Sequence, residues 1–390
     1  MATQLTASAS KGKLYGLDHL RTLAIVLVLI YHYRIFFHPE WIDTVGKFGW
    51  TGVDLFFVLS GYLIAAQLFK QMAAGKGLSL KQFFIKRSFR ILPAYFVVVA
   101  IYFLFPYVHE RPALAPLWKY LTFTQNLGLD LRTQGTFSHA WSLCIEEQFY
   151  LLLPLILLGL VYFNALKKGF WLLVGLFIAG LLIRLYCYQV LLLPQIENGA
   201  FGVLWYKWIY YPSYSRLDGL LIGVGIAAFL QYKPVQAKRI LQYGNQLLVL
   251  GILILAGAYF LCLDELSFGA SVFGFPLISL GYGVMVLGAL SPGSVLYNYN
   301  SRTTTTIATL SYAIYLVHKF IIHITQDQLA KLGVDKNSNL MLGICVVTVL
   351  LGAWVLNRLV EKPFLKMRDR VLQDKQVGKK RKLVVKTVEE

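Results

Sequence analysis

Two side chains that could do chemistry, Arg21 and His32, lie eleven residues apart in one apolar segment, residues 17–37. Eleven residues make almost three turns of an α-helix, so both side chains point the same way, roughly 16 Å apart along the axis. Asp18 falls on the same stripe. An ionisable group within a membrane helix costs about 2.5–3.5 kcal/mol on insertion scales and usually faces protein or a wet cavity. The stripe therefore predicts one solvated path for reaction or transport. A hydrogen-bonded core histidine is the plainer alternative for His32.

A basic pair precedes the third apolar segment, in the string KQFFIKRSFRILPAY. Arg87 and Arg90 are three residues apart and so share one helix face. Two guanidinium forks on one face suit phosphate groups, because each can make paired charge-assisted hydrogen bonds. Ordinary topology-setting charge is the alternative reading of the same residues.

The string TFSHAWSLCIEEQFYLLLP places a carboxylate within an apolar helix. Glu146 and Tyr150 are four residues apart and share a face, with Ser142 one turn before Glu146. Because an isolated carboxylate in a membrane is costly, Glu146 should meet a cation, a hydroxyl or a proton. A purely structural ion pair remains open.

Three further clusters combine polar residues with glycine or aromatic side chains. GWTGVDLFFVLSGYLI places Asp54 between glycines that allow close approach of two backbones. YSRLDGLLIG places Arg216 and Asp218 at a membrane boundary, where pairing with each other is the plain explanation. LSYAIYLVHKF brings Tyr315 and His318 into the ninth apolar segment, where interfacial anchoring is the alternative to a functional role.

Composition indicates what must position these residues. Of 390 residues, 57% are hydrophobic and only 14% are charged, which predicts an all-α, polytopic membrane bundle of about ten transmembrane helices. The expected spans are residues 17–37, 48–70, 89–108, 138–163, 170–192, 217–231, 246–263, 271–290, 303–324 and 340–360. The four cysteines are scattered without metal-ligand spacing, so we expect small buried residues and no metal site.

The positive charge follows the loops. The net charge of +18 comes from Lys and Arg between the apolar segments and near the C-terminus, which is typical of orientation signals and does not indicate nucleic-acid binding. It places both termini in the cytoplasm. We expect a cytoplasmic segment at residues 1–16, a retained membrane domain at 17–364 and a basic tail at 365–390 that could hold anionic lipid.

Taken in order, the motifs resemble the integral-membrane acyltransferase-3 family, whose members acylate sugars and other hydroxyl-bearing molecules. The matching strings are LDHLRTLAIVLVLIYH, GVDLFFVLSGYLI, FFIKRSFRILPAY, SHAWSLCIEEQFYLLLP, RLDGLLIG, LSYAIYLVH and VEKPF, which run from Leu17 to Phe364. Thr22 and His19 depart from the glycine and the small residue usual in the family beside the first-span arginine.

The resemblance implies roles for residues of this chain. It implies that His32 is catalytic with Arg21 as its partner, that Arg87 and Arg90 serve the acyl-CoA donor, and that Glu146 belongs to the active site. Arg21 could also contact the donor phosphates, and Glu146 could orient the imidazole of His32.

The function implied is a membrane O-acyltransferase of the bacterial inner membrane (the plasma membrane). It would move an acyl group, acetyl by resemblance, from acyl-CoA to a hydroxyl of a carbohydrate, surface polysaccharide or lipid-linked glycan. His32 would act as base or as acyl carrier, and the acceptor could enter from outside. No additional soluble hydrolase-like domain is expected. A proton-coupled transporter and a flippase-like protein for lipid-linked sugars are the alternatives.

Overall fold

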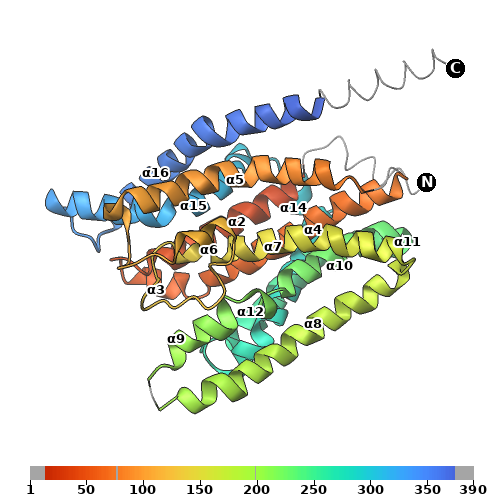
Figure 1. Cartoon of the computed structure of the whole chain (residues 1–390), viewed down its shortest axis with the longest axis horizontal. Helices are drawn as coiled ribbons and strands as arrows, with labels where there is room; N and C mark the ends of the chain where they lie inside the picture. The colour runs from red at the N-terminus through yellow and green to blue at the C-terminus, as the bar shows by residue number, and fades with distance from the viewer. Residues whose placement is uncertain (1–13, 76–77, 198, 374–390) are drawn as a thin grey trace.

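The computed structural model describes residues 14–75, 78–197 and 199–373, and this part of the chain is helical without a β-strand. Long helices lie side by side, and the described chain begins and ends at the same end of the bundle (Figure 1). In chain order the long helices are α2 (Tyr15–Tyr33), α4 (Gly52–Ala73), α5 (Leu80–Leu104), α7 (Trp141–Tyr162), α8 (Gly169–Tyr186), α10 (Asp218–Tyr232), α12 (Gly244–Leu261), α13 (Phe275–Leu290), α15 (Arg302–Lys331) and α16 (Asn339–Leu356).

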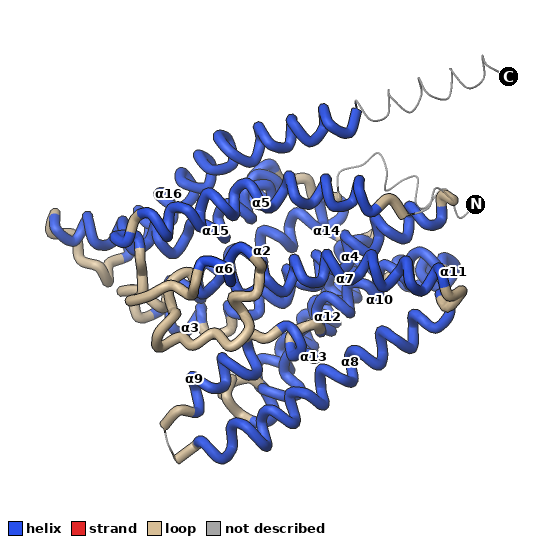
Figure 2. The backbone as a smooth tube through the Cα atoms, viewed as in Figure 1, coloured by secondary structure: helices blue, strands red, loops and turns tan. Residues whose placement is uncertain are grey.

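Short helical segments connect or extend the long ones, and loops are concentrated at the end of the bundle opposite the chain ends (Figure 2). The short α-helices are α3 (Trp41–Gly46), α6 (Leu117–Leu121), α9 (Phe201–Trp205), α11 (Pro234–Leu241) and α14 (Val295–Asn298). The 3₁₀ turns are η1 (Gly49–Thr51), η2 (Pro106–Val108), η3 (Ser138–Ala140), η4 (Leu166–Lys168), η6 (Leu193–Gln195) and η8 (Ser213–Ser215). The π-helical turns are η5 (Cys187–Leu192), η7 (Tyr206–Tyr210), η9 (Ala270–Gly274) and η10 (Asn357–Glu361).

The bundle is that of a multi-pass membrane protein, and each of the ten predicted spans overlaps one of the long helices. Among the described residues, eight helices are long and apolar enough to cross a bilayer, or nine if α10 and α11, bent by 110° at Pro234, form one span. The helix α2 is not among them, since charged and polar residues occupy its first turns. The number of ten crossings therefore remains a prediction.

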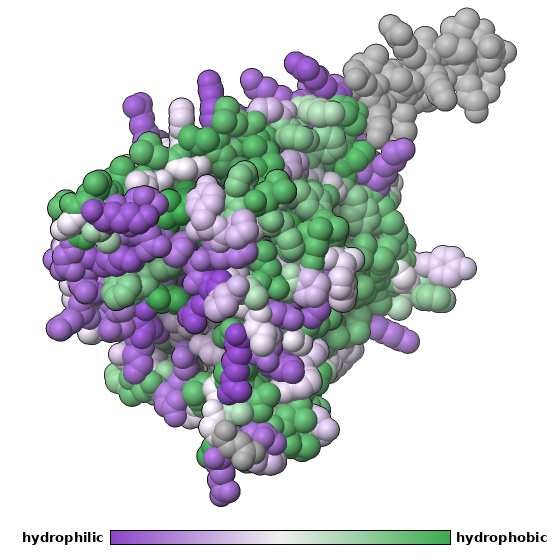
Figure 3. Space-filling view, turned by 60° about the vertical axis from the view of Figure 1, so that its left-hand side comes forward, coloured by the Kyte–Doolittle hydropathy of each residue, from purple (hydrophilic) through white to green (hydrophobic). Residues whose placement is uncertain are grey.

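Burial separates central from peripheral helices. In the most apolar stretch of α4 and of α13, 67% of the residues are buried within the protein, against 11% in the α8 span and 17% in α12. Hydrophobic side chains cover much of the flank of the bundle, while hydrophilic ones gather over the end that carries α3, α6 and α9 (Figure 3). An apolar flank between two polar ends is what a bilayer requires.

Two helix pairs position the polar residues. The helices α2 and α15 run parallel, because Thr22 donates a hydrogen bond to the carbonyl oxygen of Thr304 near one end (2.8 Å) and His32 meets His318 further along (3.0 Å). The helices α4 and α10 touch through glycine: a Cβ on Gly61 would lie only 2.2 Å from the carbonyl oxygen of Leu220. The prediction that glycines near Asp54 permit close backbone approach is confirmed.

Other expectations meet the structure with smaller differences. The third span begins earlier than predicted, at Leu80, so that Arg87 and Arg90 lie inside α5. All four cysteines are buried and free, as expected. The helical backbone that follows α16 continues through η10 to residue 373, whereas most of the predicted N-terminal segment and the last part of the basic tail lie outside the described residues.

Candidate active site

A first cavity, of about 270 Å³, lies in the half of the bundle where the described chain begins and ends. We name it the basic cavity, since three arginines line it: Arg21 from α2, and Arg87 and Arg90 from α5. Arg87 and Arg90 form no ion pair with another described residue, and the nearest carboxylate oxygen to Arg21 belongs to Asp18, at 3.8 Å. Three guanidinium groups therefore converge on one space with most of their donors unused.

Glu146 and Tyr150 line the same cavity from α7 and share a face, as the four-residue spacing predicts. The Tyr150 hydroxyl donates to a Glu146 carboxylate oxygen (3.2 Å) and also contacts the hydroxyl of Ser60. The guanidinium of Arg87 lies 5.3 Å from the centre of the Tyr150 ring. The carboxylate thus meets a hydroxyl and lies near a cation. Each is among the partners that the sequence predicts for Glu146.

A second cavity, of about 240 Å³, lies toward the other end of the bundle. We name it the histidine cavity, because His32 and His139 line it together with Ser138 and Lys319. Its other walls are largely aromatic and come from four parts of the chain: Tyr31, Trp50, Trp141, and Tyr206 with Tyr210 and Tyr211.

The hydrogen bonds of His318 define the proton positions of the neutral His32 ring. His318 Nδ1 lies 2.8 Å from the carbonyl oxygen of Tyr315 and 3.2 Å from that of Ile314, so this nitrogen must carry the proton. Nε2 of a neutral His318 is then an acceptor, and His32 Nδ1 donates to it at 3.0 Å. His32 Nε2 is left unprotonated and makes no hydrogen bond with the described residues, which is the state that a general base requires.

Sequence reasoning missed His139 as a site residue, although it belongs to the quoted SHAWSL string. Its ring lies 4.8 Å from that of His318 and 5.8 Å from that of His32, measured between centroids. Both ring nitrogens are buried without a hydrogen-bond partner among the described residues. Within that part of the chain, these rings and the nearby carboxylates form no group of three or more that could hold a metal ion.

Lys319 and Glu110 form a second pair that sequence reasoning missed. The ammonium group lies 3.1 Å from a carboxylate oxygen of Glu110, which also accepts a hydrogen bond from the backbone N–H of Phe137 (3.1 Å). Glu110 comes from a loop and Lys319 from α15, so the two residues are far apart in the sequence and no local spacing rule relates them. Only the fold brings them together.

The structure divides the predicted single path into two cavities. Val53 lines both, while Tyr315 and Ser142 line the basic cavity at its boundary with His139. The Tyr315 hydroxyl bonds to the carbonyl oxygen of His139 and to the Ser142 hydroxyl, which closes this boundary. Arg21 and His32 share the inward face of α2, but they line different spaces.

Glu146 and His32 also lie in different cavities. The residue that orients the His32 ring in the structure is His318, with which it shares a hydrogen bond. Glu146 is instead engaged with Tyr150 in the basic cavity.

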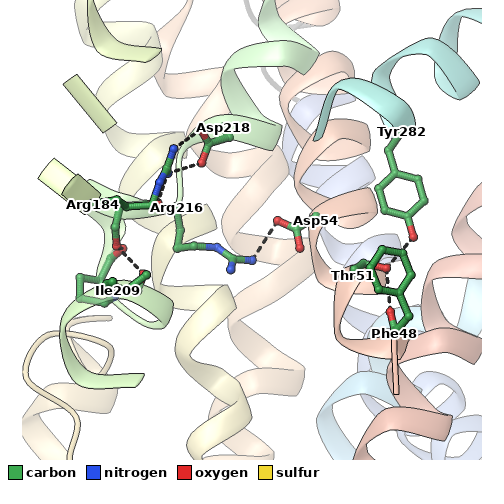
Figure 4. A network of polar contacts seen from close by, with 10 residues as sticks. Phe48, Thr51, Asp54, Arg184, Ile209, Arg216, Asp218 and Tyr282 are labelled. Atoms are coloured by element: carbon green, nitrogen blue, oxygen red, sulfur yellow. Dashed lines mark hydrogen bonds and ion pairs between the residues drawn. The ribbon is translucent and has the colours of Figure 1, made fainter. Parts of the chain in front are cut away.

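The predicted pairing of Arg216 with Asp218 is wrong. Arg216 pairs with Asp54 of α4 (2.9 Å), and Asp218 takes two hydrogen bonds from Arg184 of α8 (2.6 and 3.0 Å; Figure 4). Residues two apart at the start of a helix do not face each other, so each side chain of the pair meets a different neighbour. Arg184 is fully buried and was missed, because nothing near it in sequence marks it as a partner.

This buried network lies beside the histidine cavity without lining it. The Arg216 guanidinium lies 3.9 Å from the centre of the Phe275 ring and 4.7 Å from that of Tyr210, and Tyr210 lines the cavity. The Asp54–Arg216 pair therefore joins α4 to the start of α10 behind the cavity wall, and the Arg184–Asp218 pair joins α8 to α10.

Thr22 and His19, the two residues that depart from the family pattern beside Arg21, each contact the backbone of a neighbouring segment. Thr22 donates to the backbone of Thr304, and His19 Nε2 contacts the carbonyl oxygen of Tyr299 at 2.8 Å. Asp18 lies within 3.5 Å of the Thr305 hydroxyl. Both unusual residues thus join the start of α2 to α15 and to the segment before it.

Comparison with known proteins gives a consistent result. The family model described as an acyltransferase domain, acyltransferase-3, matches residues 14–358. A peptidoglycan O-acetyltransferase, OatA, of Listeria monocytogenes is 28% identical over 341 residues, which cover 82% of this chain and 51% of the relative. A putative O-acetyltransferase of Staphylococcus aureus (strain COL) is 29% identical over 332 residues, 79% of this chain and 50% of the relative.

The chain thus spans about half the length of the curated relatives it matches. No solved structure matches it. Since the family model covers most of the sequence, including every segment that lines the two cavities, the chain belongs to the acyltransferase-3 family.

Proposed function

We propose that this chain is an O-acetyltransferase that moves an acetyl group from acetyl-CoA to a hydroxyl of a carbohydrate acceptor in the bacterial inner membrane. The observation that carries the proposal is the adjacency of two unlike cavities. One is lined by three arginines, the other by a histidine free to act as a base, and they meet at Val53. The names of the relatives, O-acetyltransferases, favour acetyl among acyl groups.

The basic cavity suits the phosphorylated donor. Arg87 is half-buried and Arg90 is exposed, and neither forms an ion pair with the described residues. Each guanidinium can therefore pair with an anion that supplies several acceptor oxygens. Arg21 completes the set from α2. The rise of an α-helix puts Arg21 and His32 roughly 16 Å apart. An extended pantetheine arm can cover a comparable length, so the thioester would reach the boundary between the cavities.

The chemistry follows from the free Nε2 of His32. As a base, Nε2 takes the proton of the acceptor hydroxyl while the oxygen attacks the thioester carbonyl. The carbon–sulfur bond then breaks, and the CoA thiolate leaves and takes the proton from the imidazolium. As a nucleophile, Nε2 attacks the thioester carbon, the carbon–sulfur bond breaks, and CoA leaves as a thiolate. The acceptor oxygen then attacks the acetyl carbon, the carbon–nitrogen bond breaks to restore the imidazole, and the hydroxyl proton passes through water to the thiolate. In both routes His318 holds the His32 ring in the reactive tautomer.

The boundary must open for either route. Tyr315 and Ser142 close it through hydrogen bonds between neutral groups, which can break without the loss of an ion pair. Rotation of the Tyr315 side chain, driven by the arriving donor, would join the two spaces. Glu146 and Tyr150 would then form the wall along which the arm lies.

Orientation follows from the loop charges. With the chain ends in the cytoplasm, the basic cavity faces the compartment that contains acetyl-CoA, and the histidine cavity faces outward. The acetyl group would then cross the membrane while CoA stays inside. A glycan of the cell surface or a lipid-linked glycan could reach His32 from outside.

The test uses purified protein in lipid nanodiscs with labelled acetyl-CoA and a panel of glycan acceptors. We expect transfer by the native protein, loss of transfer in His32→Ala, and retention in His38→Ala. His38 is the matched control because it lies in a loop, outside both cavities, in contact with Asp43. Transfer that survives in His32→Ala would remove His32 from the mechanism. Uptake of a sugar into vesicles without acetyl-CoA would favour the transporter or flippase alternative instead.

A further inference from the structure

The histidine cavity carries positive charge without a lining carboxylate. Arg111 and Lys319 both line it, and no Asp or Glu does. Lys319 is paired with Glu110 at 3.1 Å, so its charge is largely balanced. Arg111 is exposed, and its guanidinium forms no ion pair and no hydrogen bond with the described residues. One cation at this cavity therefore lacks an anion.

The position of Arg111 is determined by its surroundings. The backbone carbonyl of Arg111 accepts a hydrogen bond from the Thr136 hydroxyl at 2.5 Å, and the neighbouring Glu110 accepts one from the Phe137 N–H. The side-chain stem lies against Gly135, where a Cβ would approach the Arg111 Cγ to 3.2 Å. The loop that carries Arg111 is thus attached to the segment that leads into Ser138.

His139 adds an unused polar group inside the same cavity. Its side chain is 2% exposed, and neither ring nitrogen has a partner among the described residues. A buried polar group without a hydrogen bond costs about 1–3 kcal/mol, so such a group usually has a ligand or an ordered water. A neutral imidazole offers one donor and one acceptor, which matches the hydroxyl groups of a sugar.

The walls and the volume limit what can enter. The ring faces of Trp50, Trp141 and Tyr211 suit the apolar face of a sugar ring, while its hydroxyls need only a few polar groups. The volume of about 240 Å³ is below the roughly 300–1,000 Å³ of pockets that enclose drug-sized ligands. One sugar unit fits this space better than an oligosaccharide does.

From these features we infer that the histidine cavity binds one sugar unit that carries a carboxylate. The carboxylate would pair with Arg111, a ring hydroxyl with His139, and the hydroxyl to be acetylated with His32. This inference rests on the proposed function, because it identifies the cavity as the acceptor site. A charge-assisted pair between guanidinium and carboxylate supplies the selectivity over neutral sugars.

The test measures binding without acetyl-CoA. The full chain in phosphatidylcholine nanodiscs is dialysed to equilibrium against labelled methyl glucuronide or its neutral counterpart, methyl glucoside. We expect the acidic sugar to bind at least about tenfold more tightly, and Arg111→Gln to remove that preference. Arg132→Gln makes the same change of charge in an exposed residue of the same outer region and should keep the preference. Equal binding of both sugars by the native protein, or a preference that persists in Arg111→Gln, would overturn the inference.

Two further measurements avoid dependence on a single variant. Arg111→Lys should keep a reduced preference for the acidic sugar, because lysine keeps the charge but cannot form a bidentate pair. Salt at 0.5 M should weaken the preference of the native protein, because it screens the charge. Transfer assays then separate the two proposals. Absence of acetyl transfer to either sugar, with the binding preference intact, would count against the proposed function only. Equal transfer efficiency for both sugars would count against this inference only.

Discussion

The hydroxyl of Tyr315 donates a hydrogen bond to the backbone carbonyl oxygen of His139 at 2.5 Å, and this contact ties α15 to the start of α7. A phenol has a single proton, so the Ser142 hydroxyl must donate to the Tyr315 oxygen, 2.7 Å away. Tyr315 lines the basic cavity and His139 the histidine cavity. The Tyr315 hydroxyl therefore joins Ser142 and the His139 backbone at the boundary between the cavities.

Tyr315→Phe removes both hydrogen bonds without changing the size of the ring. A buried hydrogen bond contributes about 0.5–1.5 kcal/mol, and these bonds keep the boundary closed. Their removal should ease its opening and raise kcat for acetyl transfer about three- to tenfold. The KM for acetyl-CoA should change less than about twofold, since Tyr315 does not lie among the arginines. Steady-state kinetics with labelled acetyl-CoA measures both quantities.

Tyr312→Phe is the matched control for that substitution. Tyr312 also lines the basic cavity from α15, but its hydroxyl donates to the carbonyl oxygen of Ile91 (2.9 Å), away from the boundary. We expect kcat to stay within about twofold of the native value. Equal effects of the two substitutions would show that the boundary has no special role.

His318→Phe deprives His32 Nδ1 of its acceptor. The His32 ring then loses the hydrogen bond that fixes its tautomer, and such a loss has cost up to about 10⁴-fold in a hydrolase triad. We expect kcat to fall by about 100-fold or more. In His318→Gln the side-chain oxygen can still accept the proton, so a substantial part of the activity should return.

His323→Phe is the control on the same helix. His323 is partly exposed and contacts Asp327 at 3.6 Å, outside both cavities. Native-like kcat is expected. If His318→Phe were as active as this variant, the tautomer assigned to His32 would not matter for the reaction.

The sequence predicts the helical segments and the identity of many site residues, but not their partners. The alternation of apolar and polar stretches determines α4, α7 and α15, because lipid requires long apolar helices. The grouping of Arg21, Arg87 and Arg90 around one space agrees with the face-sharing expected from helix periodicity. Pairings across helices are different, since they depend on packing.

Arg216 illustrates this limit. Its partner Asp54 is 162 residues away, and the partner of Asp218, Arg184, lies in an otherwise apolar helix. Local spacing rules carry no information on such contacts. The same holds for His318 beside His32, which requires α2 and α15 to be parallel and in register. His139 was quoted within its motif but could not be placed beside His318 without the fold.

The corrected ion pairs lead to a prediction on stability. Breaking a buried pair by removing one partner costs about 3–5 kcal/mol, because the other charge stays buried and uncompensated. In a double-mutant cycle, Arg184→Gln with Asp218→Asn should give a coupling energy at least about 1 kcal/mol larger than Arg216→Gln with Asp218→Asn. Reversible unfolding in mixed micelles measures both cycles. A larger coupling energy for Arg216 with Asp218 than for Arg184 with Asp218 would instead support the Arg216–Asp218 pairing expected from the sequence.

The basic cavity makes a prediction on donor binding. Arg87→Gln and Arg90→Gln each remove a guanidinium that can form charge-assisted hydrogen bonds worth about 1.5–3 kcal/mol, so each should raise the KM for acetyl-CoA about tenfold or more. Lys81→Gln, at the exposed start of the same helix, should leave this KM unchanged. A similar rise in all three variants would indicate general attraction of the donor to a basic surface rather than contact in the cavity.

The contact between α4 and α10 predicts that the smallest possible enlargement of a glycine is harmful there. A Cβ on Gly223 would lie 2.3 Å from the carbonyl oxygen of Val58, so Gly223→Ala must push the two helices apart. Asp54 and Arg216 join the same two segments, and separation would also stretch their ion pair. We expect a fall of several degrees in the apparent Tm together with reduced transfer.

Gly175→Ala, in the mostly exposed helix α8, meets no atom within 4 Å of its new Cβ. Because alanine favours a helix by up to about 1 kcal/mol over glycine, this control should leave the Tm unchanged or slightly higher. If Gly223→Ala behaved like Gly175→Ala, the close approach of the two backbones would not limit the fold, and the position of Asp54 behind the histidine cavity would need another explanation.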